Sequence, residues 1–506
     1  MLIFKNQKVM KTNISTYISA TLLALLVLSS CSKDFLDRKP LGQLTEEDLP
    51  AGSLEGQVLA IYAGLRSEGT SGLPYVGVHN MRSDDAEIGS SVGDEAGSAP
   101  NTDDFQYTTN FWLWGNYWTD HYKLIALTNT AIETADSLGD QSPEVARGLA
   151  EAKFFRAWAY FNLVRAFGEV PKIDFRVRDQ KESILPKSPI ADIYALIDAD
   201  LEYATQHLPL NWESRFIGRI TQGAAFAVQA KTFLARQQYS KALAASRMVI
   251  NSGQYNLSVA YNQIFRESSE NSKESVFEIQ AYYAQGQTNL GITYAGRQGV
   301  RGSGAMNLGW GWNVPNERLA KAFEEGDPRK DETLLYAGRV NTPYVELIPA
   351  ATATVPRAYW NKKVYTDPKI RTATGSQAGE WFNFRVIRYA DVVLMAAEAA
   401  NEVGEQEAAL TYLEQIRVRA RGGNNAILPK VTTTNQQELR LAIRHERQVE
   451  LGMENERFFD LIRWNIDAET FKDAGKTNYQ LRNRYLPIPQ NEIDRSGGVL
   501  IQNPNY

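Results

Sequence analysis

The sequence predicts a mostly α-helical protein, in which tetratricopeptide-like helical hairpins form a scaffold and a loop-rich insertion contains short β-strands. The clearest hairpin spans 388–421, where apolar residues recur every three or four positions in two successive runs. Gly404 separates the runs, and Gly422 and Gly423 follow the second one, as is typical where helices end. Two amphipathic helices cannot cover their own apolar faces, so further hairpins are expected.

A second hairpin is predicted over 221–252. Thr221 is a favourable N-cap for an alanine-rich helix that ends near Arg236, and another apolar run begins at Tyr239. The length of this segment is close to the tetratricopeptide period of about 34 residues. Another alanine-rich packing of helices is the alternative, because the sequence contains no second clear copy of the repeat consensus.

The elements before this hairpin are predicted in chain order. A short helix over 54–65 precedes a stretch rich in Gly, Ser and Asp, 67–104, which predicts long surface loops. Further helices are expected from about 118, over 151–167, and up to 207 after the start signal Ser188-Pro189.

The helical period fades after the second hairpin. The segment 275–280 alternates like a strand, and glycine and proline are frequent as far as 380. Helical patterns return at 388 and continue over 436–464. We therefore expect one domain, 31–506, with a helical scaffold over 51–255 and 381–506 and a loop-rich insertion at about 256–380 that carries the ligand site.

The amino terminus is typical of an exported protein. Three lysines precede an apolar run over 20–28, which is too short to span a bilayer but fits a signal peptide over 1–30. Cys31, the only cysteine, follows the run in a setting that resembles a bacterial lipobox. We expect Cys31 to carry lipid that holds the protein on a membrane surface. The alternative is a chance cysteine after an ordinary signal peptide.

Composition and charge exclude several function classes. The chain has 506 residues, of which 43% are hydrophobic and 22% charged, as in ordinary folded domains. A net charge of -5 without a basic block argues against a nucleic-acid partner. The chain contains four histidines, and Val449 stands where a zincin helix starting at His445-Glu446 would need its second histidine. No metal site, cofactor or catalytic residue is therefore expected.

The charged segment 446–464 is interpreted as structural. Arg447 and Glu450 are spaced to pair along a helix, and so are Asp460 and Arg463.

Aromatic residues provide the candidate ligand site. Trp112 and Trp114 lie in FWLWGNYW, and Trp310 and Trp312 lie in GWGW. In an extended backbone the members of each pair point the same way, so they form flat platforms on which a pyranose ring can stack. Packing of these rings beneath their own loops is the alternative. The other candidates are the polar residues Asn116, Arg82 and Asp84 and, with weaker support, Tyr282, Tyr283 and Tyr294.

Five segments together resemble the SusD/RagB family of outer-membrane nutrient-binding lipoproteins. They are RAWAYFNLVRAFGEVP (156–171), GRITQGAAFAVQAK (218–231), RYADVVLMAAEA (388–399), ERQVELGMENERFFDLIRW (446–464) and YLPIPQNEID (485–494). The resemblance extends over 31–506 and implies a helical fold with tetratricopeptide-like units. The charged residues after Cys31 likewise resemble the surface-export signals of Bacteroidota lipoproteins.

The resemblance implies a lipoprotein on the outer cell surface that captures oligosaccharide without altering it. It also implies a partner, a TonB-dependent transporter resembling SusC, which receives the ligand. Three alternatives stay open: capture of peptides by the same kind of protein, a surface glycoside hydrolase, and a helical scaffold for other surface proteins. A glycosidase needs two carboxylates at a fixed separation, which a sequence does not reveal.

Overall fold

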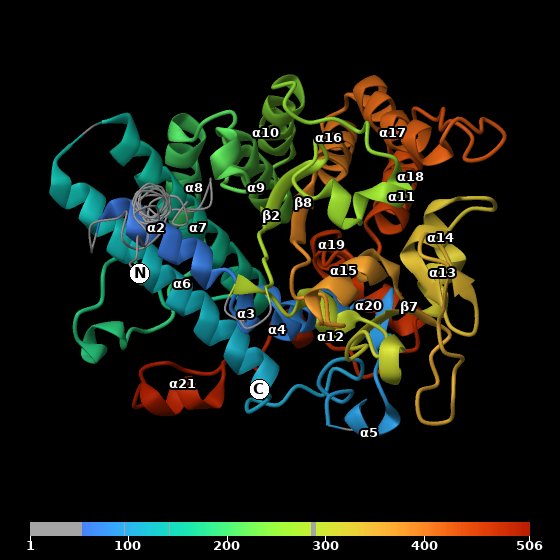
Figure 1. Ribbon diagram of the computed structural model, residues 1–506. Coiled ribbons are helices and arrows are strands. Elements are labelled where there is room, and N and C mark those ends of the chain that lie inside the picture. Colours follow the sequence, from blue (N-terminus) through green and yellow to red (C-terminus); the bar gives the residue numbers. More distant parts are fainter. Residues whose placement is uncertain (1–52, 96, 141, 285–289) are drawn as a thin grey trace, which may run out of the picture.

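The computed structural model describes residues 53–506, except 96, 141 and 285–289 (Figure 1). The expected signal peptide and Cys31 lie outside the described residues. In Figure 1 the helices between Trp112 and Asn251 occupy the left and top, α16 (Tyr389–Glu402) to α18 (Gln436–Leu451) the upper right, and the loop-rich segment the lower right.

Helices make up most of the described chain, which confirms the predicted fold class. The longer ones are α2 (Leu54–Gly64), α6 (Trp112–Leu138), α7 (Pro143–Phe167), α8 (Ile190–His207), α9 (Gln222–Ala235), α10 (Tyr239–Asn251), α16 (Tyr389–Glu402), α17 (Gln406–Arg421) and α18 (Gln436–Leu451). The shorter ones are α3 (Glu68–Ser71), α4 (Leu73–Val76), α5 (Val92–Glu95), α11 (Tyr261–Ile264), α12 (Tyr294–Gln298), α13 (Glu317–Ala322), α14 (Arg329–Thr333), α15 (Pro368–Thr374), α19 (Arg457–Arg463), α20 (Asp467–Asp473) and α21 (Gln490–Arg495).

Both predicted hairpins form. The Thr221 hydroxyl accepts the Ala224 N–H at 3.2 Å and caps α9, which packs on α10. Gly404, between α16 and α17, has φ +89°, and Gly422, after α17, has φ +56°; both are conformations that favour glycine. Helix α10 also packs on α16, so the two hairpins share one core although 137 residues separate Tyr389 of α16 from Ser252 after α10.

The strands form short antiparallel pairs. The pairs are β1 (Ala86–Ile88) with β3 (Asn313–Pro315), β2 (Ser275–Ile279) with β8 (Phe384–Arg388), β4 (Leu334–Tyr336) with β7 (Tyr359–Asn361), and β5 (Val340–Asn341) with β6 (Glu346–Leu347). The predicted strand at 275–280 is thus confirmed. Strand β8 leads directly into α16, so the loop-rich segment is fixed to the helical hairpins at this point.

The stretch 67–104 differs from the prediction of surface loops. Much of 69–90 is buried, in short helical turns and β1 that cover α6. The small residues that suggested loops instead allow close approach: a Cβ on Gly69 would lie 2.3 Å from the Asn116 carbonyl oxygen of α6. Two helix boundaries also differ, because α6 begins at Trp112 and the predicted helical segment 436–464 is interrupted between α18 and α19.

A buried ion network joins the loop-rich segment to the hairpins. The carboxylate of Glu450 in α18 lies 3.0 Å from Arg388, which ends β8, and 3.1 Å from Arg329 of α14. It also pairs with Arg419 of α17. Glu450 itself is fully buried, so these contacts replace the water that its charge would otherwise need.

This network contradicts one predicted pair. Arg447 does not bind Glu450 but pairs with Asp391 at 2.9 Å and Asp460 at 3.2 Å, because three other guanidinium groups already surround Glu450. The predicted pair of Asp460 with Arg463 is confirmed at 2.7 Å.

Candidate functional site

Trp310 is held on a loop that backbone hydrogen bonds fix to α12. The Trp310 N–H donates to the Gly296 carbonyl at 2.8 Å, and the Trp312 N–H donates to the Arg297 carbonyl at 2.9 Å. A Cβ on Gly309 would lie 2.1 Å from the same Gly296 oxygen, so the loop can approach α12 this closely only with glycine there. The backbone that carries the Trp310 side chain is therefore fixed by hydrogen bonds to α12.

A cavity of about 320 Å³ lies beside this loop. Its lining combines one aromatic ring with groups that donate and accept hydrogen bonds, which is the composition of a site for a polar small molecule. The lining residues are Thr293, Gly296, Arg297, Arg301, Asn307, Gly309, Trp310, Ala378 and Glu380.

Ion pairs hold the two arginines of this cavity. The Arg297 Nε donates to Glu68 of α3 at 2.8 Å, and the other oxygen of Glu68 accepts the Thr293 hydroxyl at 2.6 Å. Arg301 pairs with Asp94 at 3.2 Å. Hydrogen bonds from Ser90 and Ser91 lower the pKa of Asp94, so this carboxylate is ionised at neutral pH. Each cation thus keeps a defined orientation and has a matching anion.

The Trp310 ring is 42% exposed, and the guanidinium carbon of Arg301 lies 4.7 Å from its centre. This contact is a cation–π interaction that covers one face of the indole. The exposed part of the ring is available to a ligand.

Trp112 and Trp114 do not form the predicted platform. They lie in the first turn of α6 rather than in extended backbone, and residues two apart on a helix point in different directions. Trp112 is 45% exposed, whereas Trp114 is fully buried and packs edge-on against Phe111, with ring centres 5.0 Å apart. Asn116, also on α6, is exposed. Helix α3 packs between α6 and α12, because Gly69 donates its N–H to Asp120 of α6 while Glu68 binds Arg297.

Three other predicted residues are buried. Arg82 donates to the Val78 carbonyl and lies over the ring of Phe458, with its guanidinium carbon 3.9 Å from the ring centre. Asp84 forms ion pairs with Arg457 at 2.8 Å and with Arg318 at 3.1 Å.

Tyr294, the third of these, stacks on Phe384 with ring centres 4.2 Å apart and is 6% exposed. Arg82, Asp84 and Tyr294 are therefore parts of the core in this structure. The sequence could not reveal this for Asp84 and Tyr294, because their partners Arg318, Arg457 and Phe384 lie far along the chain.

Three aromatic candidates lie nearer the surface. Trp312 is half-buried and packs on the main core, since Gly311 at φ +66° interrupts the extended backbone that would align it with Trp310. Tyr282 is 53% exposed and Tyr283 is half-buried, but neither lines the cavity beside Trp310.

Sequence reasoning missed the polar residues of the cavity. Arg297 and Arg301 are four residues apart on either side of the end of α12, next to a glycine-rich stretch, and that spacing was an available signal. Asn307 is exposed in the same loop. Glu380 comes from the segment before β8, which only the fold brings to this position.

Glu324, His445 and Glu446 form an ionic cluster in which their ligand atoms lie within 4.8 Å of one another. Arg417 binds both carboxylates, at 2.7 Å and 2.8 Å, and the His445 Nε2–H donates to the Ala322 carbonyl at 2.7 Å. The groups that a metal would need are thus already bound by protein partners.

Two family models match the chain. A model described as "SusD family" matches residues 273–506, and one described as "Starch-binding associating with outer membrane" matches residues 34–234. SusD-like protein P2 of Formosa agariphila is 29% identical over 96% of this chain and 98% of its own length. A SusD-like protein of Bacteroides ovatus is 24% identical over 87% of this chain and 80% of its own length.

Solved structures share the fold. A laminarin-binding SusD-like protein has a TM-score of 0.74 at 24% identity, covering 90% of this chain and 99% of its own. Surface glycan-binding protein A from Bacteroides thetaiotaomicron, solved with laminarihexaose, has a TM-score of 0.73 at 22% identity, covering 90% and 99%. Because the two family models together match nearly the whole length from residue 34 to 506, the chain belongs to the SusD family.

Proposed function

We propose that this protein captures an oligosaccharide at the cell surface and passes it to a TonB-dependent transporter resembling SusC. The observation that carries the proposal is the cavity beside Trp310, where an exposed indole lies next to fixed arginine, asparagine and carboxylate side chains. The indole face suits the C–H face of a pyranose, and the polar groups suit its hydroxyls.

The charges of this cavity favour a neutral glycan. Arg297 and Arg301 are each paired with a carboxylate, and Glu380 adds a further negative charge to the lining. An acidic sugar would therefore meet no unpaired cation here. The ligands named for the structural neighbours, laminarin and laminarihexaose, support a β-glucan as the first ligand to test.

Calorimetry with a panel of neutral oligosaccharides, laminarihexaose included, tests the proposal. We expect saturable binding of at least one glycan and no new reducing ends after long incubation. Release of reducing ends would favour the glycoside hydrolase instead. Peptides of mixed sequence serve as competitors, and displacement of the glycan by a peptide would favour the peptide-capture alternative.

Transfer to a transporter and attachment to the membrane are further parts of the proposal. Among the described residues, no helix has both the length and the apolar character needed to cross a bilayer. One of the two family models is described as associating with the outer membrane, which supports a surface-attached protein. Attachment would depend on lipid at Cys31, which precedes the described residues.

We expect Cys31→Ala to release the protein from the membrane fraction. A thiol at this position is the acceptor for the acyl chains that would provide attachment. The measurement is fractionation of cells that express the wild type or the variant, followed by immunoblotting, with Cys31→Ser as a second thiol-free variant. Full retention of both variants in the membrane fraction would contradict the anchor.

A further inference from the structure

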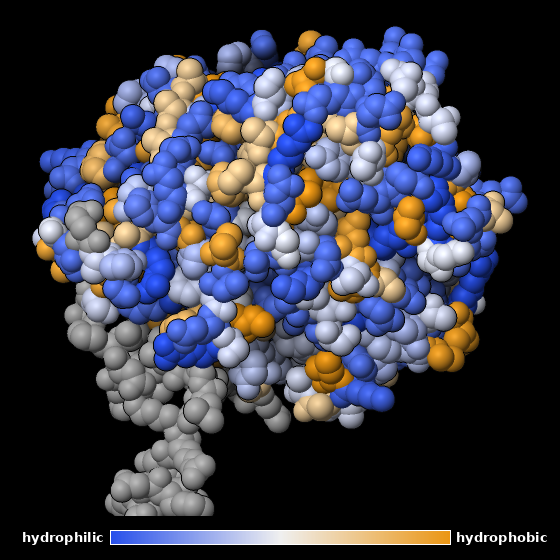
Figure 2. All heavy atoms as spheres, turned by 90° about the horizontal axis from the view of Figure 1, so that it is seen from above, coloured by the Kyte–Doolittle hydropathy of each residue, from blue (hydrophilic) through white to orange (hydrophobic). Residues whose placement is uncertain are grey.

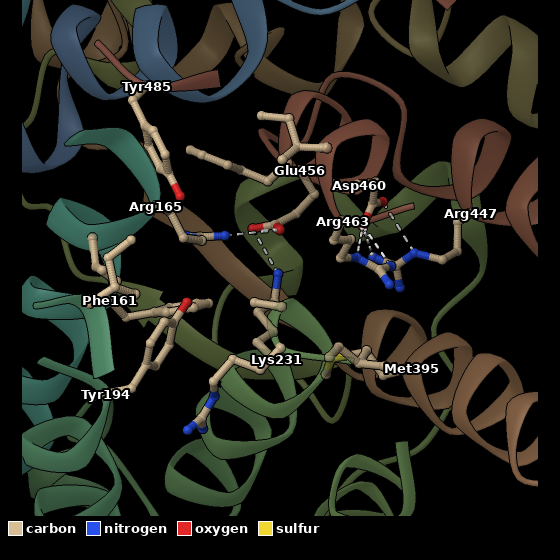
Figure 3. A pocket seen from close by; sticks show the side chains of 17 residues that line it. Phe161, Arg165, Tyr194, Lys231, Met395, Arg447, Glu456, Asp460, Arg463 and Tyr485 are labelled. Carbon is tan, nitrogen blue, oxygen red and sulfur yellow. Dashed lines mark hydrogen bonds and ion pairs between the residues drawn. The ribbon is translucent and has the colours of Figure 1, made fainter. Parts of the chain in front are cut away.

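A second cavity, of about 270 Å³, lies between helices α7, α8, α9, α16 and α19 (Figure 3). It shares no lining residue with the cavity beside Trp310. Its walls combine aromatic rings with cationic and hydroxyl groups, among them Phe161, Arg165, Tyr194, Lys231, Phe459 and Tyr485. The helical hairpins therefore enclose a polar space of their own.

Arg165, at the C-terminal end of α7, keeps unused hydrogen-bonding capacity in this cavity. Its side chain is only 9% exposed, and its Nε has no hydrogen-bond partner. One Nη donates to Asn162 at 2.8 Å, but the carboxylate of Glu456 is 3.5 Å from the other, too far for a strong bond. Buried guanidinium groups are normally fully satisfied, so this one has room for another acceptor.

Aromatic rings hold the Arg165 guanidinium in place. Its carbon lies 4.0 Å from the ring centre of Phe161 and 4.4 Å from that of Phe459. Its position is therefore set by this packing together with the ion pair to Glu456 at 3.5 Å, and its Nε–H remains without an acceptor.

Other donors face the same space. Figure 3 shows the hydroxyls of Tyr194 and Tyr485 and the ammonium of Lys231 turned towards the region around Arg165 and Glu456. Neither tyrosine hydroxyl has a hydrogen-bond partner within the described chain. Lys231 is shared between two carboxylates, because it binds Glu456 at 2.7 Å and Asp391 at 2.9 Å.

The remaining charged groups of the lining are paired. Arg236 binds Asp198, Arg447 binds Asp391, and Arg463 binds Glu398 and Asp460. Donors without a protein acceptor thus lie at Arg165, Tyr194 and Tyr485, of which the Arg165 Nε is buried, and the carboxylates of the lining, Glu456 and Asp460, are paired. Such a set recognises oxygen acceptors that carry negative charge.

We infer that the cavity binds a small molecule with a carboxylate, sulfate or phosphate group, whose oxygens accept hydrogen bonds from Arg165, Tyr194 and Tyr485. The volume of about 270 Å³ accommodates a free oxyanion or a single charged sugar. The inference does not depend on the glycan site at Trp310.

Calorimetry on the full-length protein at constant ionic strength tests this inference. The probes are sodium sulfate, sodium phosphate and glucuronate, with glucose as the neutral comparator. We expect one-to-one binding of at least one anion and none of glucose. Binding of glucuronate alone would identify a charged sugar as the ligand, and binding of sulfate or phosphate would identify a free oxyanion. Absence of saturable binding by all three anions would overturn the inference.

Variants test whether the anion binds in this cavity. Arg165→Gln is expected to weaken anion binding at least tenfold and Tyr194→Phe several-fold, while Trp310→Ala leaves it unchanged. If Arg165→Gln fails to fold, Tyr194→Phe decides, because it removes one hydroxyl and keeps the ring. Equal anion affinity in the wild type and in Tyr194→Phe would then place the anion elsewhere.

Discussion

Glu450→Gln is expected to lower the free energy of unfolding by about 3 kcal/mol or more at pH 7. The substitution keeps the shape of the side chain but removes the one carboxylate that Arg329, Arg388 and Arg419 share in the interior. The remaining carboxylates, among them Glu274 and Glu454, still pair with these arginines, but the buried network is left with one uncompensated positive charge that cannot regain water. Chemical denaturation followed by circular dichroism measures the loss.

Glu407→Gln is the matched control. Glu407 is exposed on α17 and its carboxylate faces solvent, so the same change of charge is expected to alter stability by only a few tenths of a kcal/mol. A similar effect of both substitutions would show that net charge, and not the buried network, accounts for the loss.

The same network makes the free energy of unfolding depend on pH under acidic conditions. Burial alone would raise the pKa of Glu450, but the charges of Arg419, Arg388 and Arg329 lower it from 4.5 to about 2. The unfolded chain therefore binds the proton more readily than the folded one. The contribution of Glu450 is present above about pH 4.5 and is lost as the pH falls towards 2. The free energy of unfolding of Glu450→Gln should therefore change less with pH in this range than that of the wild type.

Helical hairpins were predictable because their signals are local. Thr221 caps α9 through its own hydroxyl, and Gly404 and Gly422 end helices through their own backbone conformations. These interactions involve residues close together along the chain, so they can be recognised as one pattern in the sequence.

The candidate site was predictable only in part, because its side chains come from distant segments. Trp310 stood out through its flanking glycines, and it is exposed at a cavity. Trp114 stood out because it lies in the tryptophan-rich segment FWLWGNYW, yet it is buried, because this segment begins a helix. Composition alone does not distinguish an exposed aromatic loop from the amphipathic first turn of α6.

The polar half of the site depends on the fold. Glu68 fixes Arg297 at 2.8 Å although 229 positions separate them in the chain. Asp84, by contrast, was chosen as a ligand contact but forms ion pairs with Arg318 and Arg457, 234 and 373 positions away. Such long-range packing decides whether a charged residue contacts a ligand or another charged residue.

Trp310→Ala is expected to weaken binding of the best oligosaccharide at least tenfold, or about 1.4 kcal/mol. The substitution removes the only aromatic ring of the cavity lining and leaves the polar groups without a surface on which the sugar can stack. Because the ring is 42% exposed, the stability of the protein should change little. Calorimetry with the same glycan and a thermal melt measure the two quantities separately.

Trp112→Ala is the matched control, since Trp112 is similarly exposed at 45% but lies on α6, on the other side of α3. It should bind the glycan as the wild type does. Loss of affinity in Trp112→Ala with full affinity in Trp310→Ala would move the site to the N-terminal end of α6. Loss in both variants would indicate a longer glycan that crosses α3, because only an extended ligand can contact both rings. The two variants together therefore show where the binding surface lies and how far it extends.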